Sequence, residues 1–242
     1  VAIKHVTLEC GGKNPIVVFP DADIDAALEG VVRGMNFSFQ GQSCGSTSRL
    51  VVHEDIHASF VEALAERLGD LRVGLPEEET TQVGALVSRA QLDKVTGYVA
   101  LGTSEGATLV AGGTRPQEPE LANGFFLRPA LFDDVDPGMR LAQEEIFGPV
   151  LAVMPFRGAA QALAIANDIR FGLTASVYTR DLQTAHAFAR DVEAGFVWVN
   201  DSGRHFLGTP FGGFKESGLG REGDTEELYS YTQVKNVSVL FE

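Results

Sequence analysis

Short apolar runs alternate with longer segments of helical periodicity along this chain, and that alternation constrains the fold more than any other feature. The runs are rich in β-branched residues and lack the polar alternation of a half-exposed strand, which is typical of strands buried on both faces. They cover residues 6–8, 16–19, 49–52, 107–110, 150–155, 175–178 and 196–199.

Amphipathic segments lie between several of these runs. Residues 23–35 begin with acidic side chains, which helix N-termini prefer. Two further segments carry one apolar stripe each, Phe60, Ala63, Leu64 and Leu68 in the first and Ala185, Phe188, Ala189 and Val192 in the second. Strands joined through helices predict βαβ crossovers. The expected class is α/β, an open, mostly parallel twisted sheet with helices on both faces.

The amino-acid composition argues against some classes of binding partner. The chain has a net charge of −14 and a pI near 4.7, which argues against binding nucleic acid or an anionic membrane through a basic face. At 44% hydrophobic residues it can bury a sizeable core. Two cysteines make no disulfide framework, and no apolar run approaches the ~20 residues of a membrane span. A reducing, cytoplasmic location is therefore expected.

Two short motifs match but lack the context that their chemistry needs. Residues 53–57 fit H-E-x-x-H, yet His53 ends an expected strand, so the two histidines would straddle a strand–helix boundary instead of sharing one helix face around zinc. Residues 218–223 fit the dinucleotide fingerprint G-x-G-x-x-G, but no buried strand precedes them and too little chain follows for a βαβ unit.

A third match directs attention to a thiol. Residues 41–45 fit the serine-hydrolase pattern G-x-S-x-G, but they follow a helix and precede a strand, the reverse of a nucleophile elbow around Ser43. The neighbouring Cys44 is the better candidate, because a thiolate is the stronger nucleophile and a glycine-flanked loop leaves room for substrate.

Five motifs in register resemble those of the aldehyde dehydrogenase superfamily. They are Leu8-Glu9-Cys10-Gly11-Gly12-Lys13 (with Cys10 where leucine is usual), Gly41-Gln42-Ser43-Cys44, Glu144-Glu145-Ile146-Phe147-Gly148-Pro149-Val150, Trp198-Val199-Asn200, and Pro210 to Gly218. The sequence Ser46 to Arg49 is similar to the betaine-aldehyde branch of the family.

The resemblance implies a mechanism and its residues. Cys44 would attack the aldehyde carbon, a hydride would leave to the nicotinamide of NAD or NADP, and Glu9 would be the general base for thioester hydrolysis. The alternatives are a small core cysteine and a glutamate facing water. Burial at the end of an apolar strand should raise the pKa of Glu9.

Other residues take roles only through the resemblance. Glu145 and Phe147 match positions that hold the nicotinamide ribose and ring, with a structural turn as the alternative. Asn200 matches a position near the pocket, or it caps a turn. Arg204 and His205 fall at the substrate entrance, which predicts a polar or aromatic aldehyde; as loop residues they would instead face solvent.

The resemblance also bears on domain organisation. Residues 1–228 would form the catalytic domain, and residues 229–242 a final strand like the one this family uses in assembly, so a homo-oligomer is expected. The main NAD-binding half of the family lies outside this chain, which makes cofactor binding by the chain itself doubtful. Two other functions therefore remain open, a free-standing thiol hydrolase that turns over esters with Cys44 and Glu9, and a remnant without activity.

Overall fold

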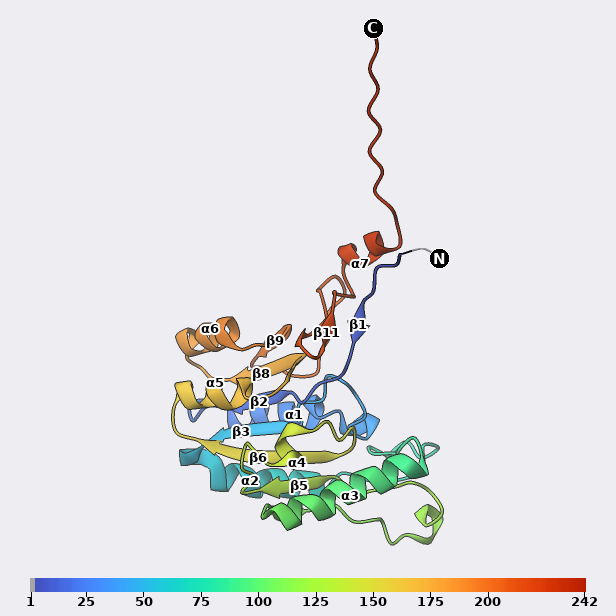
Figure 1. Cartoon of the computed structure of the whole chain (residues 1–242). Coiled ribbons are helices and arrows are strands. Elements are labelled where there is room, and N and C mark those ends of the chain that lie inside the picture. The colour runs from blue at the N-terminus through green and yellow to red at the C-terminus, as the bar shows by residue number, and fades with distance from the viewer. Residues whose placement is uncertain (1–2) are drawn as a thin grey trace.

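A seven-stranded sheet organises the computed structural model, which describes residues 3–242. The strand order is β4-β5-β6-β3-β2-β8-β9, and every neighbouring pair is parallel except β4–β5 (Figure 1). These strands are β2 (Pro15–Val18), β3 (Arg49–His53), β4 (Thr108–Ala111), β5 (Ala130–Asp133), β6 (Val150–Phe156), β8 (Thr174–Tyr178) and β9 (Phe196–Val199). The α/β class and the mostly parallel sheet are as predicted.

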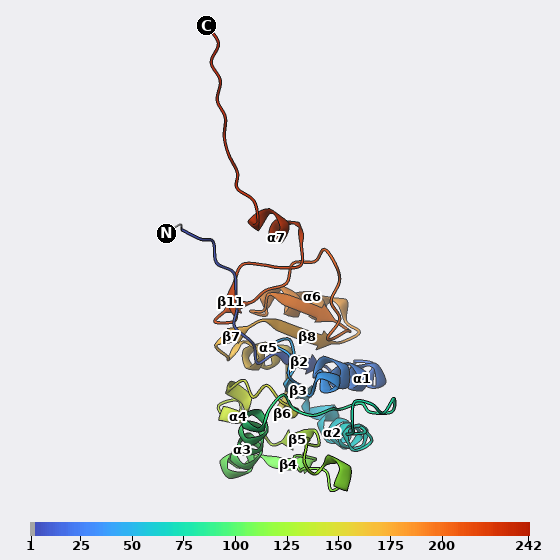
Figure 2. The ribbon, with the colours of Figure 1, turned by 90° about the vertical axis from the view of Figure 1, so that its right-hand side faces the viewer.

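Helices cover both faces of the sheet. They are α1 (Ile24–Gly34), α2 (Glu54–Gly69), α3 (Arg89–Glu105), α4 (Arg140–Gln143), α5 (Ala159–Asn167), α6 (Leu182–Asp191) and α7 (Thr225–Ser230). Figure 2 shows α1 and α2 on one side of the strands and α3, α4 and α5 on the other. Alternate strand residues feed two separate cores, so that Ile16 and Leu50 pack with α1 and α2, while Val17 and Val51 face the opposite helices.

Local sequence explains where several helices begin. Asp23 caps α1 by accepting a hydrogen bond from the amide of Ala26, as the acidic start of this segment predicts. Ser88 and Asp181 cap α3 and α6 in the same way. His53 is the N-cap of α2, so the two histidines of the H-E-x-x-H match do straddle a helix boundary.

Several strands differ from the sequence prediction, among them β5, β4 and β1. β5 was not predicted, because its apolar run is short and lies among loop-like residues. β4 is exposed, not buried on both faces, because it is the antiparallel edge strand of the sheet. The first strand, β1 (Leu8–Glu9), is also exposed and lies outside the central sheet, where it pairs with β11 (Gly218–Leu219).

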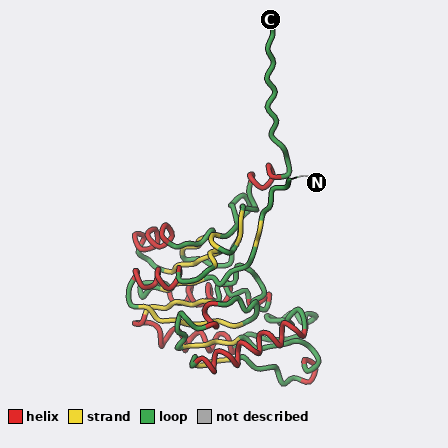
Figure 3. Tube along the Cα trace, viewed as in Figure 1, coloured by secondary structure: helices red, strands yellow, loops and turns green. Residues whose placement is uncertain are grey.

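The chain after α7 runs as an exposed, extended segment away from the body (Figures 1 and 3). The expected boundary between residues 228 and 229 falls inside α7, and the described tail contains no strand. A strand needs a partner for its backbone hydrogen bonds, and one chain offers none here. The strand in residues 229–242 stays a prediction about an assembly. No helix among residues 3–242 is long and apolar enough to cross a bilayer.

Candidate active site

Cys44 lies in the loop that leads into β3, at the amino ends of the parallel strands. The same edge of the sheet receives the chain from Glu9 into β2 and from Leu173 into β8. Open α/β sheets usually bind ligands at the carboxyl ends of their strands. The site here is therefore built from the segments that enter the strands.

A cavity of about 470 Å³ opens onto Cys44. Its lining residues are Ser43, Cys44, Gly45, Phe196, His205, Phe206, Leu207, Thr209, Phe211, Glu222, Gly223 and Glu227. Three of the rings pack on one another, with centroids 5.8 Å apart for Phe196 and His205 and 5.1 Å apart for His205 and Phe211. One wall is thus aromatic, while Glu222 and Glu227 add an acidic rim.

The thiol of Cys44 is half-buried, and opposing influences act on its pKa. Burial raises the pKa of the thiol, and the negative charge of Glu9 raises it further, followed by that of Glu145. The backbone amides of Gly45 and of Cys44 itself donate toward the sulfur and lower the pKa. The resting group is therefore a thiol, with amide donors in place for the thiolate that forms when a base takes the proton.

Glu9 is held beside this thiol by a two-stranded ladder. It lies opposite Gly218 in the β1–β11 pair, and the amide of Cys10 donates to the carbonyl of Ser217 at 2.7 Å. Desolvation raises the pKa of Glu9, Glu222 raises it further, and Arg221 opposes both. The pKa of Glu9 is thus raised, as expected from the sequence, although the residue is exposed to solvent.

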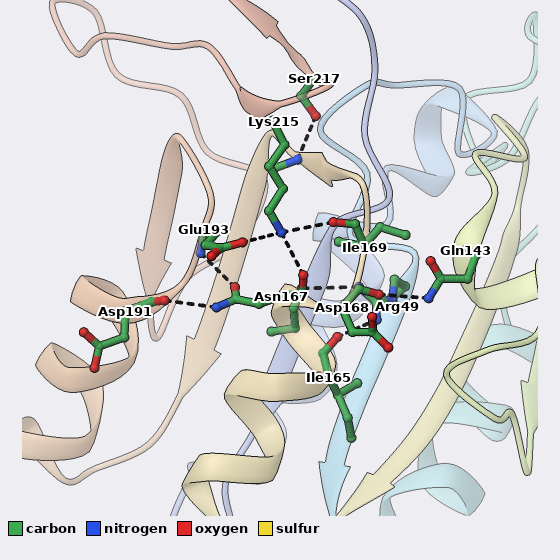
Figure 4. A network of polar contacts seen from close by, with 12 residues as sticks. Arg49, Gln143, Ile165, Asn167, Asp168, Ile169, Asp191, Glu193, Lys215 and Ser217 are labelled. Carbon is green, nitrogen blue, oxygen red and sulfur yellow. Dashed lines mark hydrogen bonds and ion pairs between the residues drawn. The ribbon is translucent and has the colours of Figure 1, made fainter.

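The turn that carries this ladder is anchored by a polar network (Figure 4). The ammonium of Lys215, in β10 (Phe214–Lys215), donates to the carbonyls of Asn167 and Ile169 at 2.7 and 3.0 Å and pairs with Glu193 at 2.5 Å. The buried hydroxyl of Ser217 accepts from the amide of Gly172 at 2.9 Å. These contacts tie the strand opposite Glu9 to the end of α5 and to β7 (Phe171–Gly172).

Glu145 and Phe147 lie next to the glycines that follow Glu9. The carboxylate of Glu145 accepts from the amide of Gly12 at 3.0 Å, and a Cβ on Gly11 would stand 2.6 Å from both of its oxygens. Phe147 has a positive φ of 58° and a ring that is 37% exposed, and Gln91 donates to its carbonyl at 2.6 Å. A carboxylate in a glycine cradle beside an exposed ring fits the ribose and ring of a nicotinamide.

The structure separates the three residues assigned to the pocket. His205 lines the Cys44 cavity. Arg204 is not among the lining residues, and its guanidinium stands 3.7 Å from Asp201. Asn200 follows the carboxyl end of β9, where its amide accepts from and donates to the backbone of Thr179. That geometry favours the alternative of a strand-end asparagine that caps a turn.

Sequence reasoning passed over Glu222 and Arg221, whose charges act on Glu9. Both lie inside the G-x-G-x-x-G match, and their signal was their place beside the Pro210 to Gly218 signature. In the H-E-x-x-H match, Nε2 of His57 is hydrogen-bonded to the carboxylate of Asp133 at 2.8 Å. Residues 3–242 contain no cluster of histidine, cysteine and acidic side chains suited to a metal ion.

An α/β fold that presents a cysteine with amide donors at a cavity, and a carboxylate whose charge acts on that thiol, can support covalent thiol catalysis. A family model described as the aldehyde dehydrogenase family matches residues 1–237, and the chain belongs to this family.

Relatives and solved structures agree. An aldehyde dehydrogenase of Talaromyces stipitatus is 46% identical, covering 98% of this chain and 47% of the relative. A betaine aldehyde dehydrogenase of Brucella anthropi is 45% identical, with 98% and 48% covered. The crystal structure of betaine aldehyde dehydrogenase from Staphylococcus aureus in complex with NAD+ superposes with a TM-score of 0.91 at 37% identity, covering 93% of this chain and 44% of that one. The chain thus spans about half the length of the curated relatives it matches.

Proposed function

We propose that this chain carries the nucleophile and the general base of an NAD(P)-dependent aldehyde dehydrogenase, an oxidoreductase that converts an aldehyde into a carboxylic acid. The single observation that carries the proposal is the cavity in which the Cys44 sulfur faces its own amide and that of Gly45 within reach of the Glu9 charge. Family membership supports the same reaction type.

The residues of the chain divide the chemistry between them. Glu9 accepts the proton of the thiol, and the Cys44 sulfur forms a bond to the aldehyde carbon, leaving an oxyanion beside the Cys44 amide. Glu145 and Phe147 would hold the nicotinamide end of the cofactor, which when bound accepts the hydride released from that carbon. Once Glu9 has given that first proton up to solvent, it takes a proton from water, whose oxygen bonds to the thioester carbon and displaces the Cys44 sulfur. The acid is released, and the proton passes from Glu9 to the departing thiolate.

The aromatic wall supports a substrate class. Phe196, His205 and Phe211 form a continuous aromatic surface above Cys44, so an aldehyde with an aromatic or polar group is favoured over a long alkyl aldehyde. A panel of aldehydes tests this choice. A preference for alkyl aldehydes would contradict it.

A thiol esterase is the second candidate, because acylation and deacylation need only Cys44 and Glu9, and both lie in this chain. An ester such as p-nitrophenyl acetate would acylate the sulfur and release its alcohol, and water would then free the acid.

Hydrolysis of p-nitrophenyl acetate by the chain, with Cys44→Ala and Ser43→Ala as a matched pair, tests the nucleophile. Loss of turnover in Cys44→Ala alone supports the proposal, and turnover that survives that change overturns it. Reduced-nicotinamide formation with aldehyde and NAD separates the dehydrogenase from the esterase.

Assembly and location belong to the same proposal. The exposed tail residues Tyr231, Val234, Val237, Val239, Leu240 and Phe241 would bury their apolar surface in a homo-oligomer. The two cysteines are both free, which is in keeping with the reducing cytoplasm.

A further inference from the structure

The side chain of Asn14 is fully engaged behind the catalytic loop. It is 1% exposed and stands directly before β2, between the segments that enter β3 and β8. Its Nδ2 donates to the carbonyls of Cys44 at 2.8 Å and of Ser46 at 2.9 Å, and its Oδ1 accepts from the amide of Thr174 at 3.0 Å. Both Nδ2 hydrogens and the Oδ1 atom are therefore hydrogen-bonded to backbone atoms. Two of the three bonds are made to the loop that carries Cys44.

The bond to the Cys44 carbonyl has a geometric consequence on the other side of the peptide. In a trans peptide the C=O and the following N–H point in opposite directions. Because the Cys44 carbonyl points at Asn14, the amide of Gly45 is turned away from Asn14. A hydrogen bond from this amide is among the causes that lower the pKa of the Cys44 thiol. The hydroxyl of Thr174 adds to the arrangement by donating to the Gly45 carbonyl at 3.3 Å.

The neighbouring glycine makes this contact possible. A Cβ on Gly12 would stand 2.5 Å from Oδ1 of Asn14 and 3.0 Å from the Cys44 carbonyl oxygen. Real Cβ atoms do not approach so closely, so the position admits only glycine while Asn14 keeps its place. The backbone at Gly12 thus lies in close contact with the Asn14 side chain and with the Cys44 carbonyl.

We propose that Asn14 is a positioning residue that turns the Cys44–Gly45 peptide so that its amide faces the Cys44 sulfur and stabilises the thiolate. The inference deepens the proposed function, on which it rests for the role of Cys44. Its consequence is specific, since without Asn14 the peptide is free to rotate and the thiolate loses a donor.

The pH dependence of Cys44 alkylation by iodoacetamide, followed by mass spectrometry of the whole chain's peptides, measures this consequence. The Asn14→Ala variant should shift the profile to higher pH and lower the rate at pH 7 by roughly three- to tenfold, the range expected for the loss of one ordinary hydrogen bond. The other charged groups near the sulfur are Glu9, Glu145, His205, Glu222 and Glu227, and all of them are unchanged in this variant.

Two controls separate positioning from general loosening. The exposed Cys10 is an internal reference whose rate should not change. The Arg115→Ala variant removes a side chain that likewise bridges two backbone carbonyls, those of Ala122 and Gly124, and none of these residues lines the Cys44 cavity. It should lower stability while leaving the Cys44 profile in place.

The inference is overturned if folded Asn14→Ala reproduces the wild-type profile, or if Arg115→Ala shifts it equally. Should Asn14→Ala fail to fold, Thr174→Val removes the hydroxyl bond to the Gly45 carbonyl and should produce a smaller shift in the same direction; no shift then overturns the inference. Failure of the proposed function appears elsewhere, as ester turnover that survives Cys44→Ala, because alkylation reports the thiol itself.

Discussion

Glu9 and Gly218 lie directly opposite each other in the antiparallel β1–β11 pair. A Cβ on Gly218 would stand 1.9 Å from the carbonyl oxygen of Leu8, so this ladder closes only around a glycine. The candidate general base is therefore held by its pairing with β11 and not by the central sheet. The G-x-G-x-x-G match begins at this glycine, whose missing side chain lets the two backbones meet.

The pKa of Glu9 should respond to Glu222. In Glu222→Gln one of the causes of the raised pKa disappears, so Glu9 ionises at lower pH and the acidic limb of ester turnover moves the same way. A pH–rate profile measures the shift. The exposed Glu226→Gln makes the same change in net charge without a contact to Glu9, and an equal shift there would refute a local effect.

Gly11→Ala should destabilise the fold where this glycine packs against Glu145. The new Cβ would meet both carboxylate oxygens of Glu145 at 2.6 Å in a backbone with φ of +87°, at a cost of about 1–3 kcal/mol. Urea unfolding measures this loss. Gly97→Ala, in an open part of α3, should instead gain ~0.5–1 kcal/mol from helix propensity. Equal effects of the two substitutions would contradict the steric argument.

Lys13 should make the free energy of unfolding rise with pH above about pH 7. Burial lowers the pKa of its amine to about 7, and the structure gives the nitrogen no hydrogen-bond partner. Between about pH 7 and 10.5 the unfolded chain holds a proton that the folded chain lacks, so from this group the unfolding free energy rises with pH by up to ~1.4 kcal/mol per unit.

The Lys13→Met variant lacks this slope. Its advantage in stability over the wild type should be greatest near pH 6 and shrink toward pH 9, measured by urea unfolding at each pH. Lys4→Met, at an exposed position, should run parallel to the wild type. If the free energy of unfolding of Lys13→Met also runs parallel to that of the wild type across this pH range, the Lys13 amine is not uncharged in the folded chain.

Lys215→Met should loosen the turn that supports Glu9. It leaves the carbonyls of Asn167 and Ile169 without their donor and should cost about 1–3 kcal/mol. Hydrogen exchange gives a local readout, because the amide of Cys10 is bonded to the carbonyl of Ser217 in the same turn and should exchange faster. Lys235→Met, in the exposed tail, is the control. If the Cys10 amide exchanges at the wild-type rate in Lys215→Met, the Lys215 network does not support the strand that carries Glu9.

The predictable part of this protein is local in sequence. The central strands and the helix after Asp23 can be predicted from the spacing of apolar residues and from helix capping. The motifs around Cys44 and Glu9 are contiguous stretches, so their resemblance to the family is visible in the sequence itself. β5 and the exposed edge position of β4 were beyond such reasoning, because burial of a short apolar run depends on which strand pairs with it.

By itself, therefore, the sequence determined the α/β class, the family resemblance and the candidate nucleophile and base. Tertiary structure alone decided how they are held. It placed Gly218 against Glu9, brought His205 but not Arg204 to the cavity, and bonded Asn14 to Thr174 across 160 residues of sequence. The physical reason is that a hydrogen bond or a packed ring depends on distance in space, which residue patterns along the chain do not encode.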